Sequence, residues 1–368
     1  MEQSNNFSDA STKNSGENIY DKILEELEDF FLCINEPEYR AKQVFQWLYA
    51  KGILGFQNMT NLSLSLRQVL QEKFRLNLPT ILEVQTDKND GTKKLLIQLI
   101  DSKLIESVII YEEEKVTLCI SSQVGCPVNC KFCLTGIHGF TRNLSQGEII
   151  AQLLLSTKIA APVRITNIVF MGMGEPFLNY NELARALKII TSGDAFGYSP
   201  RRITVSTVGI LSGLKKFGSD FPKVNLAVSL NATTDDQRQK IIPVSQKHSL
   251  SGLIKACREY PLPLRKRITF EYVLIKDLND SEKDALRLIK LLKQIRCKIN
   301  LIPLNDSGLS QFKTPDPRVV EKFQRILIDA GYTVLLRKSK GSNILAACGQ
   351  LGASRNLFED MDDEKNRD

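Results

Sequence analysis

The sequence has few of the features that mark secreted, disulfide-rich or membrane-spanning proteins. No stretch approaches the ~18 consecutive apolar residues that a membrane helix needs. The first residues, MEQSNNFSDASTKNSGEN, lack the apolar core of a secretory signal. The chain holds only two His residues, so acid–base chemistry centred on histidine has few candidates. We therefore expect a cytoplasmic protein without a membrane segment.

Charge and cysteine content narrow the class further. The formal net charge of +7 is compatible with a nucleic-acid partner. For any single basic run, ordinary solvated surface charge is the better explanation. The runs are Arg201–Arg202, Lys215–Lys216, Arg265–Arg267 and Arg337–Lys340. Eight cysteines without an export signal indicate thiol or metal chemistry rather than a disulfide scaffold.

The apolar pattern changes several times along the chain. It predicts disorder over 1–17, a helical module over 18–78, a β-rich connector over 79–113, a barrel over 114–340, and a C-terminal extension over 341–368. From residue 116 onward, short apolar runs alternate with helical segments that begin at capping signals such as Ser145 with Glu148. This alternation favours an α/β fold, a partial (βα)6-type barrel with a small N-terminal all-helical accessory domain. Ligands of such barrels bind where the strands end.

A compact cysteine motif follows the first predicted barrel strand. Cys126, Cys130 and Cys133 have the spacing C-x₃-C-x₂-C. Three thiolates this close can wrap one soft metal centre, and three protein ligands leave one iron of a four-iron cluster open. Phe132 before the last cysteine completes a segment that resembles the radical S-adenosylmethionine (radical SAM) signature.

Zinc is the alternative for this motif. The same thiolates with His138 or Cys119 as a fourth ligand would suit a closed tetrahedral zinc site. A zinc-stabilised RNA-binding protein without catalysis therefore stays open at this point.

Small and polar residues follow later strands. Gly172, Gly174 and Glu175 lie in Met171–Pro176, where glycines let the backbone approach a ligand and a carboxylate can receive an ammonium group. Polar residues also stand at the ends of later strands: Ser206, Ser229, Asn231 and Asn305. Each alone is better explained as a turn or cap residue, but as a set they suggest one binding cavity. Cys348, among Ala and Leu, would alone be interpreted as a small buried hydrophobe.

Taken together, these segments resemble the radical SAM adenine-C2 RNA methyltransferases, whose sister group methylates adenine C8. The resemblance runs from about Asn35 almost to the end of the chain. It includes Tyr39–Gln43, Trp47–Tyr49, Cys119–Cys126, Gly139–Leu144, Met171–Pro176, Ser206–Gly209 and Ala346–Leu351.

The resemblance implies a radical SAM barrel that holds a 4Fe-4S cluster on Cys126, Cys130 and Cys133. It also implies S-adenosyl-L-methionine, two molecules per turnover, bound by Gly174, Glu175, Ser206, Ser229, Leu230, Asn231 and Asn305. Many relatives have His where this chain has Asn231. The implied partners are rRNA and tRNA and a low-potential electron donor such as flavodoxin or ferredoxin, and the implied state is monomeric.

The family's mechanism assigns three further residues. Cys348 would first accept a methyl group from one S-adenosylmethionine. A radical formed from a second S-adenosylmethionine would then take a hydrogen atom from this methyl group. The resulting methylene carbon would add to adenine C2. Cys119 would then resolve the protein–RNA adduct through a disulfide with Cys348, and Glu106 would accept the proton. Adenine C8 methylation, the antibiotic-resistance type, is the alternative within the enzyme class.

Overall fold

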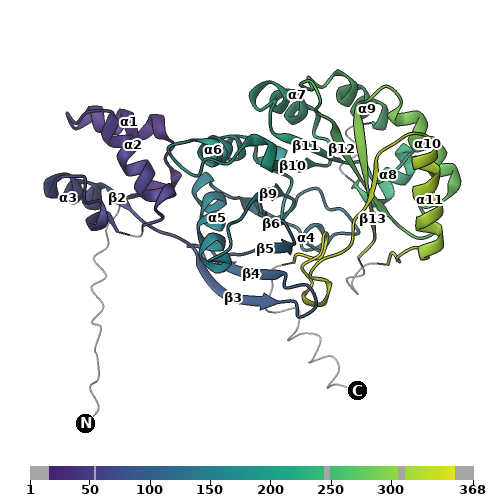
Figure 1. Ribbon diagram of the computed structural model, residues 1–368, viewed down its shortest axis with the longest axis horizontal. Coiled ribbons are helices and arrows are strands. Elements are labelled where there is room, and N and C mark those ends of the chain that lie inside the picture. Colours follow the sequence, from purple (N-terminus) through teal and green to yellow (C-terminus); the bar gives the residue numbers. More distant parts are fainter. Residues whose placement is uncertain (1–15, 54, 244–248, 306–310, 353–368) are drawn as a thin grey trace, which may run out of the picture. The chain divides into compact units, whose positions relative to one another are not determined.

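The computed structural model describes residues 16–53, 55–243, 249–305 and 311–352. The chain divides into two compact units, Met1–Asn77 and Leu78–Asp368 (Figure 1). The disorder expected over 1–17 and the last part of the extension, 353–368, lie outside the described residues except for Gly16 and Glu17. Within the described ranges, no helix is long and apolar enough to cross a membrane.

The first unit packs short helices around a small apolar core that includes Leu27, Phe31 and Leu48. It is not entirely helical, because β1 (Glu17–Asn18) pairs in parallel with β2 (Phe74–Arg75). This pairing corrects the expectation that residue 17 is disordered, since backbone hydrogen bonds join the two ends of the unit. Its helices are η1 (Ile19–Asp21), α1 (Leu24–Cys33), α2 (Tyr39–Phe45), the π-helical η2 (Gln46–Ala50), η3 (Phe56–Asn58) and α3 (Leu64–Lys73).

The second unit is built on a ten-stranded sheet. Its order is β14-β13-β12-β11-β10-β9-β6-β5-β4-β3, and every pair from β6 to β14 is parallel. The predicted α/β barrel fold is confirmed, as a sheet whose two ends stay separate in the strand order. The parallel strands are β6 (Lys115–Cys119), β9 (Asn167–Phe170), β10 (Ile203–Thr207), β11 (Asn225–Ser229), β12 (Ile268–Leu274), β13 (Cys297–Pro303) and β14 (Val334–Leu336).

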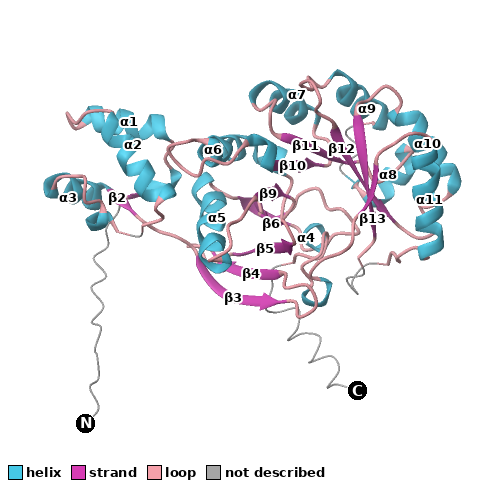
Figure 2. Cartoon of the chain, viewed as in Figure 1, coloured by secondary structure: helices cyan, strands magenta, loops and turns pink. Residues whose placement is uncertain are grey.

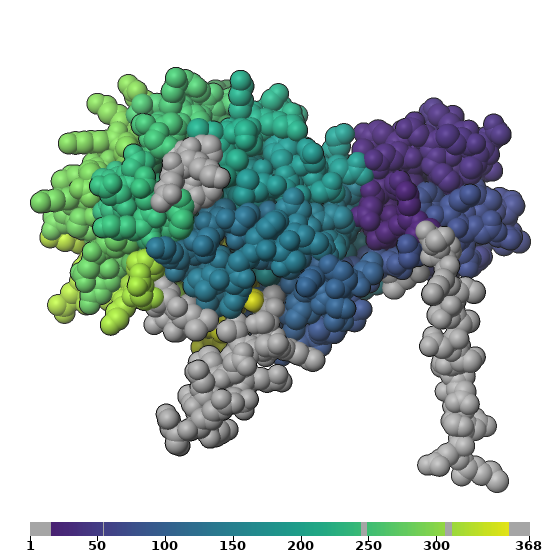
Figure 3. All heavy atoms as spheres, turned by 180° about the vertical axis from the view of Figure 1, so that it is seen from behind, coloured from purple at the N-terminus to yellow at the C-terminus, as the bar shows by residue number. Residues whose placement is uncertain are grey.

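The β-rich stretch before the barrel continues the same sheet. Its strands β3 (Thr80–Thr86), β4 (Lys93–Gln98) and β5 (Leu104–Glu112) join β6 through antiparallel pairing. Seen from behind, blue atoms of this early part of the second unit border yellow-green atoms that come late in the chain (Figure 3). The same neighbourhood brings Glu112 and Lys115 beside Lys340. Residues 104–119 therefore lie next to the segment that leads to Cys348.

Helices cover the outside of the parallel strands (Figure 2). The capping signals are present: the Ser145 Oγ accepts from the Glu148 amide at 3.2 Å, and the Glu148 carboxylate accepts from the Ser145 amide at 2.9 Å. Because the strands from β6 to β14 are parallel, their carboxyl ends point to one edge of the sheet, where the site is found. These helices are α5 (Gln146–Ala160), α6 (Tyr180–Thr191), α7 (Leu211–Asp220), α8 (Asp235–Ile241), α9 (Leu250–Glu259), α10 (Glu282–Leu292) and α11 (Pro317–Asp329).

Candidate active site

The cysteine loop is fixed by backbone hydrogen bonds on several sides. It follows β7 (Gln123–Gly125) and ends at α4 (Leu134–Ile137). The Cys126 amide donates to the Gly139 carbonyl at 2.8 Å, and the Leu134 amide donates to the Gly349 carbonyl at 2.8 Å. A Cβ added at Gly125, which has a φ of +73°, would lie 2.0 Å from that Gly139 oxygen. Glycine is therefore required where the loop begins.

The three thiols line one cavity of about 130 Å³. Burial raises the pKa of Cys126 to about 12 and that of Cys130 well above its ordinary range, and the neighbouring thiols raise both further. The buried Arg238 opposes the rise at Cys130. A metal centre that binds thiolates displaces these protons, so crowded thiols beside one buried cation are suited to an iron–sulfur cluster.

The zinc alternative needs a fourth ligand beside the three cysteines. Among the residues that the structure describes, no group of three or more His, Cys, Asp and Glu side chains is already arranged around a metal position, so the thiols are preset neither for zinc nor for a cluster. His138 lies near Gly352, where an added Cβ would be 3.0 Å from its Nε2, and it does not line the cysteine cavity. His138 is therefore not positioned as the fourth ligand of a zinc ion on these cysteines.

Glu175 places a carboxylate in the wall of the same cavity. Its Oε1 accepts from Thr207 Oγ1 at 2.7 Å, and its Oε2 accepts from the Val208 amide at 2.7 Å. Burial raises its pKa to about 7. No salt bridge joins it to a cation within the described ranges. A buried carboxylate in this state is ready to receive an ammonium group.

The other residues expected to bind the cofactor divide into two groups. Gly174, Ser229, Asn231 and Asn305 line the cysteine cavity with Glu175, whereas Ser206 and Leu230 do not. Ser206 Oγ instead donates to Glu271 Oε2 at 3.1 Å, and the Leu230 amide donates to the Glu271 carbonyl at 3.0 Å. Asn231 has a φ of +58°, and its Oδ1 accepts from the Val273 amide at 2.9 Å.

A second cavity, of about 460 Å³, adjoins the first. Cys119 at the end of β6 lines it together with Arg337, Lys338 and Lys340. Cys348 lines both cavities, as do Met171 and Asn305. The Cys348 side chain is exposed to solvent, although protein atoms crowd around its thiol. The structure thus brings Cys348 between the cysteine loop and a ligand-sized hollow with a basic wall.

Comparisons with known proteins identify the family. A model of the ribosomal RNA large subunit methyltransferase N-terminal domain matches residues 17–76, and a radical SAM superfamily model matches residues 120–289. The dual-specificity RNA methyltransferase RlmN of Syntrophus aciditrophicus is 47% identical over 335 residues, 91% of this chain and 96% of that protein. The chain belongs to the RlmN family. RlmN of Geobacter sulfurreducens is likewise 47% identical over 330 residues, 89% of this chain and 90% of that protein.

A solved structure agrees with RlmN membership. The crystal structure of a radical SAM methyltransferase from Sphaerobacter thermophilus is 40% identical, with a TM-score of 0.86 and coverage of 92% of this chain and 100% of that one. The predicted radical SAM enzyme class is therefore confirmed. S-adenosylmethionine and a 4Fe-4S cluster are the cofactors that this superfamily implies.

Two charged residues of this RlmN chain, Glu271 and Arg337, belong to the site. From the sequence, Glu271 was not identified, and Arg337 was interpreted only as part of a solvated basic run. Glu271, buried in the middle of β12, lines the cysteine cavity, and its Oε1 lies 3.8 Å from the Arg337 guanidinium. Burial raises the pKa of Cys348 to about 11 and that of Cys119 to about 12, and Arg337 opposes the rise at both thiols. The available signal was a Glu inside the apolar run Ile268–Leu274, because buried strands rarely carry an isolated charge.

Glu106 lies apart from both cavity walls. Its Oε1 is 3.2 Å from Lys94 Nζ in a buried ion pair, and its Oε2 accepts from the Gly352 amide at 2.8 Å. Gly352 is next to Leu351, which lines both cavities. Glu106 is thus connected to the segment that carries Cys348.

Proposed function

We propose that this RlmN-family chain methylates C2 of adenine in large-subunit rRNA and in tRNA, with Cys348 carrying the methyl group before it reaches the base. The position of Cys348 in the walls of both cavities carries the proposal. A residue there can accept a group from a cofactor on one side and present it to a substrate on the other. The dual-specificity RNA methyltransferase names of the relatives support RNA as the substrate.

On the cofactor side, Cys126, Cys130 and Cys133 would ligate the cluster, and Glu175 would hold the ammonium group of S-adenosylmethionine. When bound, the cluster supplies the electron that cleaves S-adenosylmethionine. Gly174 supports this assignment, since its φ of +104° and the crowding of Gln123 against its missing Cβ bring bare backbone to the cavity wall. Ser229, Asn231 and Asn305 add polar groups for the rest of the molecule.

On the substrate side, the Cys348 thiol must lose its proton before it can accept a methyl group. The Arg337 guanidinium favours that loss because it stabilises the thiolate. Lys338 and Lys340 in the same wall are suited to phosphates beside a target adenine. That adenine must leave its stack to enter the cavity, as for other enzymes that act on a base.

Cys119 and Glu106 complete the proposal. Cys119 lines the larger cavity with Cys348. Both are free thiols in this structure. The Cys119 thiolate would attack the Cys348 sulfur of the adduct, so that the disulfide forms as the bond between that sulfur and the methylene carbon breaks. The electron pair would leave with the carbon, which takes up a proton and becomes the methyl group of the released base. Glu106 would accept the proton that the adenine carbon loses, after movement of the Gly352 segment that it now binds. We further propose two S-adenosylmethionine molecules per turnover, a flavodoxin or ferredoxin as electron donor, a monomer, and a cytoplasmic location.

Nucleoside mass spectrometry tests this function. Anaerobically reconstituted protein is incubated with S-adenosylmethionine, a reductant and unmodified rRNA or tRNA. We expect 2-methyladenosine from the wild type and from Cys33→Ala, which removes an exposed cysteine of the first unit, but none from Cys348→Ala. The appearance of 8-methyladenosine would contradict the C2 assignment. Zinc in place of iron and sulfide, without methylation, would support the binding-protein alternative.

A further inference from the structure

Positive side chains gather at the edge of the sheet opposite to the active site. Each comes from a loop that enters one of four consecutive parallel strands, β10 to β13. We call this set the basic rim; its members are Arg201, Arg202, Lys223, Arg265, Lys266, Arg267 and Arg296. Sequence reasoning found two of these runs separately, but only the parallel sheet brings them to one edge.

Hydrogen bonds tie the four loops together. Lys266 Nζ donates to the Lys223 carbonyl at 3.0 Å and to Asn225 Oδ1. The side-chain Nδ2 of Asn225 donates in turn to the Arg201 carbonyl at 2.8 Å. Arg296 Nη2 donates to the Leu262 carbonyl at 2.8 Å. The rim is therefore a connected surface rather than scattered charges.

The rim includes a hollow of about 540 Å³. Arg265, Lys266, Arg267 and Arg296 line it together with Tyr332 and Thr333. Arg267 Nη1 donates to the Thr333 hydroxyl at 3.0 Å, which directs this guanidinium along the wall.

Within the described ranges, direct ion pairs with acidic side chains do not neutralise the rim. Among the described residues, no salt bridge joins any rim member to a carboxylate. Their partners are carbonyls, an amide oxygen and a hydroxyl. Burial lowers the pKa of Lys266, and the charge of Arg201 lowers it further, as expected where cations crowd together. Such a surface is complementary to a polyanion.

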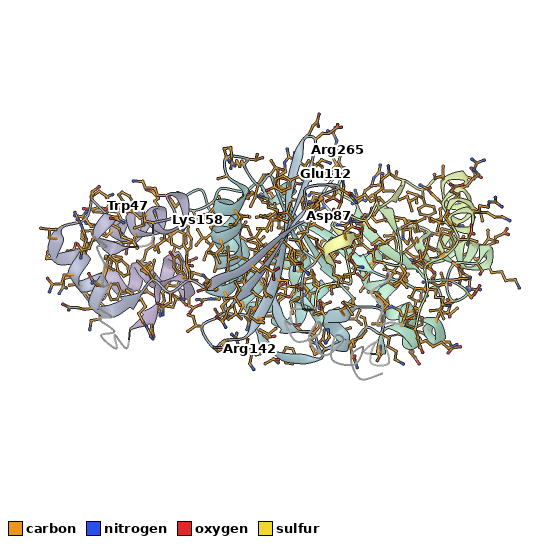
Figure 4. All side chains as sticks on the ribbon, turned by 90° about the horizontal axis from the view of Figure 1, so that it is seen from below. Trp47, Asp87, Glu112, Arg142, Lys158 and Arg265 are labelled. Carbon is orange, nitrogen blue, oxygen red and sulfur yellow. The ribbon has the colours of Figure 1, made fainter. Side chains whose placement is uncertain are left out.

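The rim is far from the chemistry. The seven residues of β12 separate the two edges by roughly 23 Å, at about 3.3 Å per residue. Seen from below, Arg265 lies on the opposite side of the second unit from Arg142, which belongs to β8 (Phe140–Asn143) beside the cysteine loop (Figure 4). A contact at the rim therefore positions a partner without touching the reacting atoms.

We propose that the basic rim binds the phosphate backbone of the RNA substrate at a point remote from the target adenine. The inference rests on the proposed function for the identity of the polyanion. Five of the seven members are Arg, whose planar guanidinium matches phosphate oxygens. An acidic electron-donor protein is the rival partner, but a donor has to come close to the cluster, which lies at the other edge of the sheet.

The test compares two RNAs and two triple variants. One RNA is a hairpin that presents only the target loop, and the other is the complete tRNA. The rim variant is Arg265→Gln, Arg267→Gln and Arg296→Gln. The control, Lys158→Gln, Lys255→Gln and Lys322→Gln, removes three exposed charges from helices of the same unit. Thermal unfolding of each variant checks its fold, and the single variant Arg265→Gln replaces the triple if the triple is misfolded.

We expect the rim variant to raise KM for the complete tRNA about tenfold or more without changing kcat, and to leave the hairpin unaffected. The slope of log binding constant against log salt should fall in magnitude by about 0.7–0.9 for each phosphate that the variant no longer neutralises. Unchanged binding and salt slope with the complete tRNA would overturn the proposal. A defect seen only with a protein electron donor, and not with a chemical reductant, would assign the rim to the donor. Absence of methylation by the wild type on both RNAs would refute the proposed function, while the salt slope would still test the rim.

Discussion

The reactivity of Cys348 gives the most direct test of the site. Burial raises the pKa of the Cys348 thiol to about 11, so at pH 8 roughly one Cys348 side chain in a thousand is a thiolate. Arg337 is the cation that opposes this rise. Replacing it by Gln removes that opposition, raises the thiol pKa further and lowers the thiolate fraction at any fixed pH.

The size of the effect follows from the surroundings of Arg337. An opposite charge within ~4–6 Å shifts a pKa by about 1–3 units. Because the Arg337 side chain is 34% exposed, solvent screening places the effect near the lower end. We therefore expect a decrease of about tenfold in the rate at which Cys348 reacts, since one pKa unit is a tenfold change in the ionised fraction.

The assay is alkylation of metal-free protein by iodoacetamide across pH 7 to 10, with the Cys348 peptide quantified by mass spectrometry. The rate should rise about tenfold per pH unit in the wild type and lie about tenfold lower in Arg337→Gln. Arg337→Lys should retain most of the rate. Lys338→Gln, which removes a neighbouring charge from the same wall, should change it little. Equal rates in Arg337→Gln and wild type would refute the proposed role of the guanidinium.

Three further changes test other parts of the site. Glu175→Gln should weaken S-adenosylmethionine binding by about 10–100-fold, because a charged hydrogen bond is worth ~1.5–3 kcal/mol. Since the pKa of Glu175 is about 7, the wild-type affinity measured by calorimetry should fall from pH 8 to pH 6 as the carboxylate is protonated. The affinity of Glu175→Gln should not change over this range. Lys94→Met leaves the buried Glu106 carboxylate without this cation and should lower the free energy of unfolding by about 3 kcal/mol in denaturant titrations, a loss that adding Glu106→Gln should partly reverse. Gly125→Ala should reduce iron bound per chain, because its Cβ would lie 2.0 Å from the Gly139 oxygen, whereas Gly139→Ala, with a φ of +81° but open space, should retain iron.

Much of the fold was predictable because local signals agreed with the tertiary structure. The apolar run Ile268–Leu274 is β12, and the pairing of Ser145 with Glu148 marks the start of α5. The strand β3 lies inside the β-rich stretch predicted over 79–113, although its side chains are exposed or half-buried along its length. The short pairing of β1 with β2 depends on contact between the two ends of the first unit, which no local pattern reports.

The cysteine loop could be found from sequence because its three candidate ligands, Cys126, Cys130 and Cys133, stand close together along the chain. Cys348 could be found only through the family resemblance, since its neighbours in the chain are those of a buried hydrophobe. Arg337, which follows β14, and Glu271, which lies in β12, are far apart in the chain and joined only by the sheet. Glu271 is a charged residue of a kind rarely found in a buried strand, and nothing in the sequence shows whether the Arg337 guanidinium faces the interior or solvent. Residues that tune a reactive thiol through space leave little pattern in the chain, because the electric field depends on distance in the folded structure and not on spacing in the sequence.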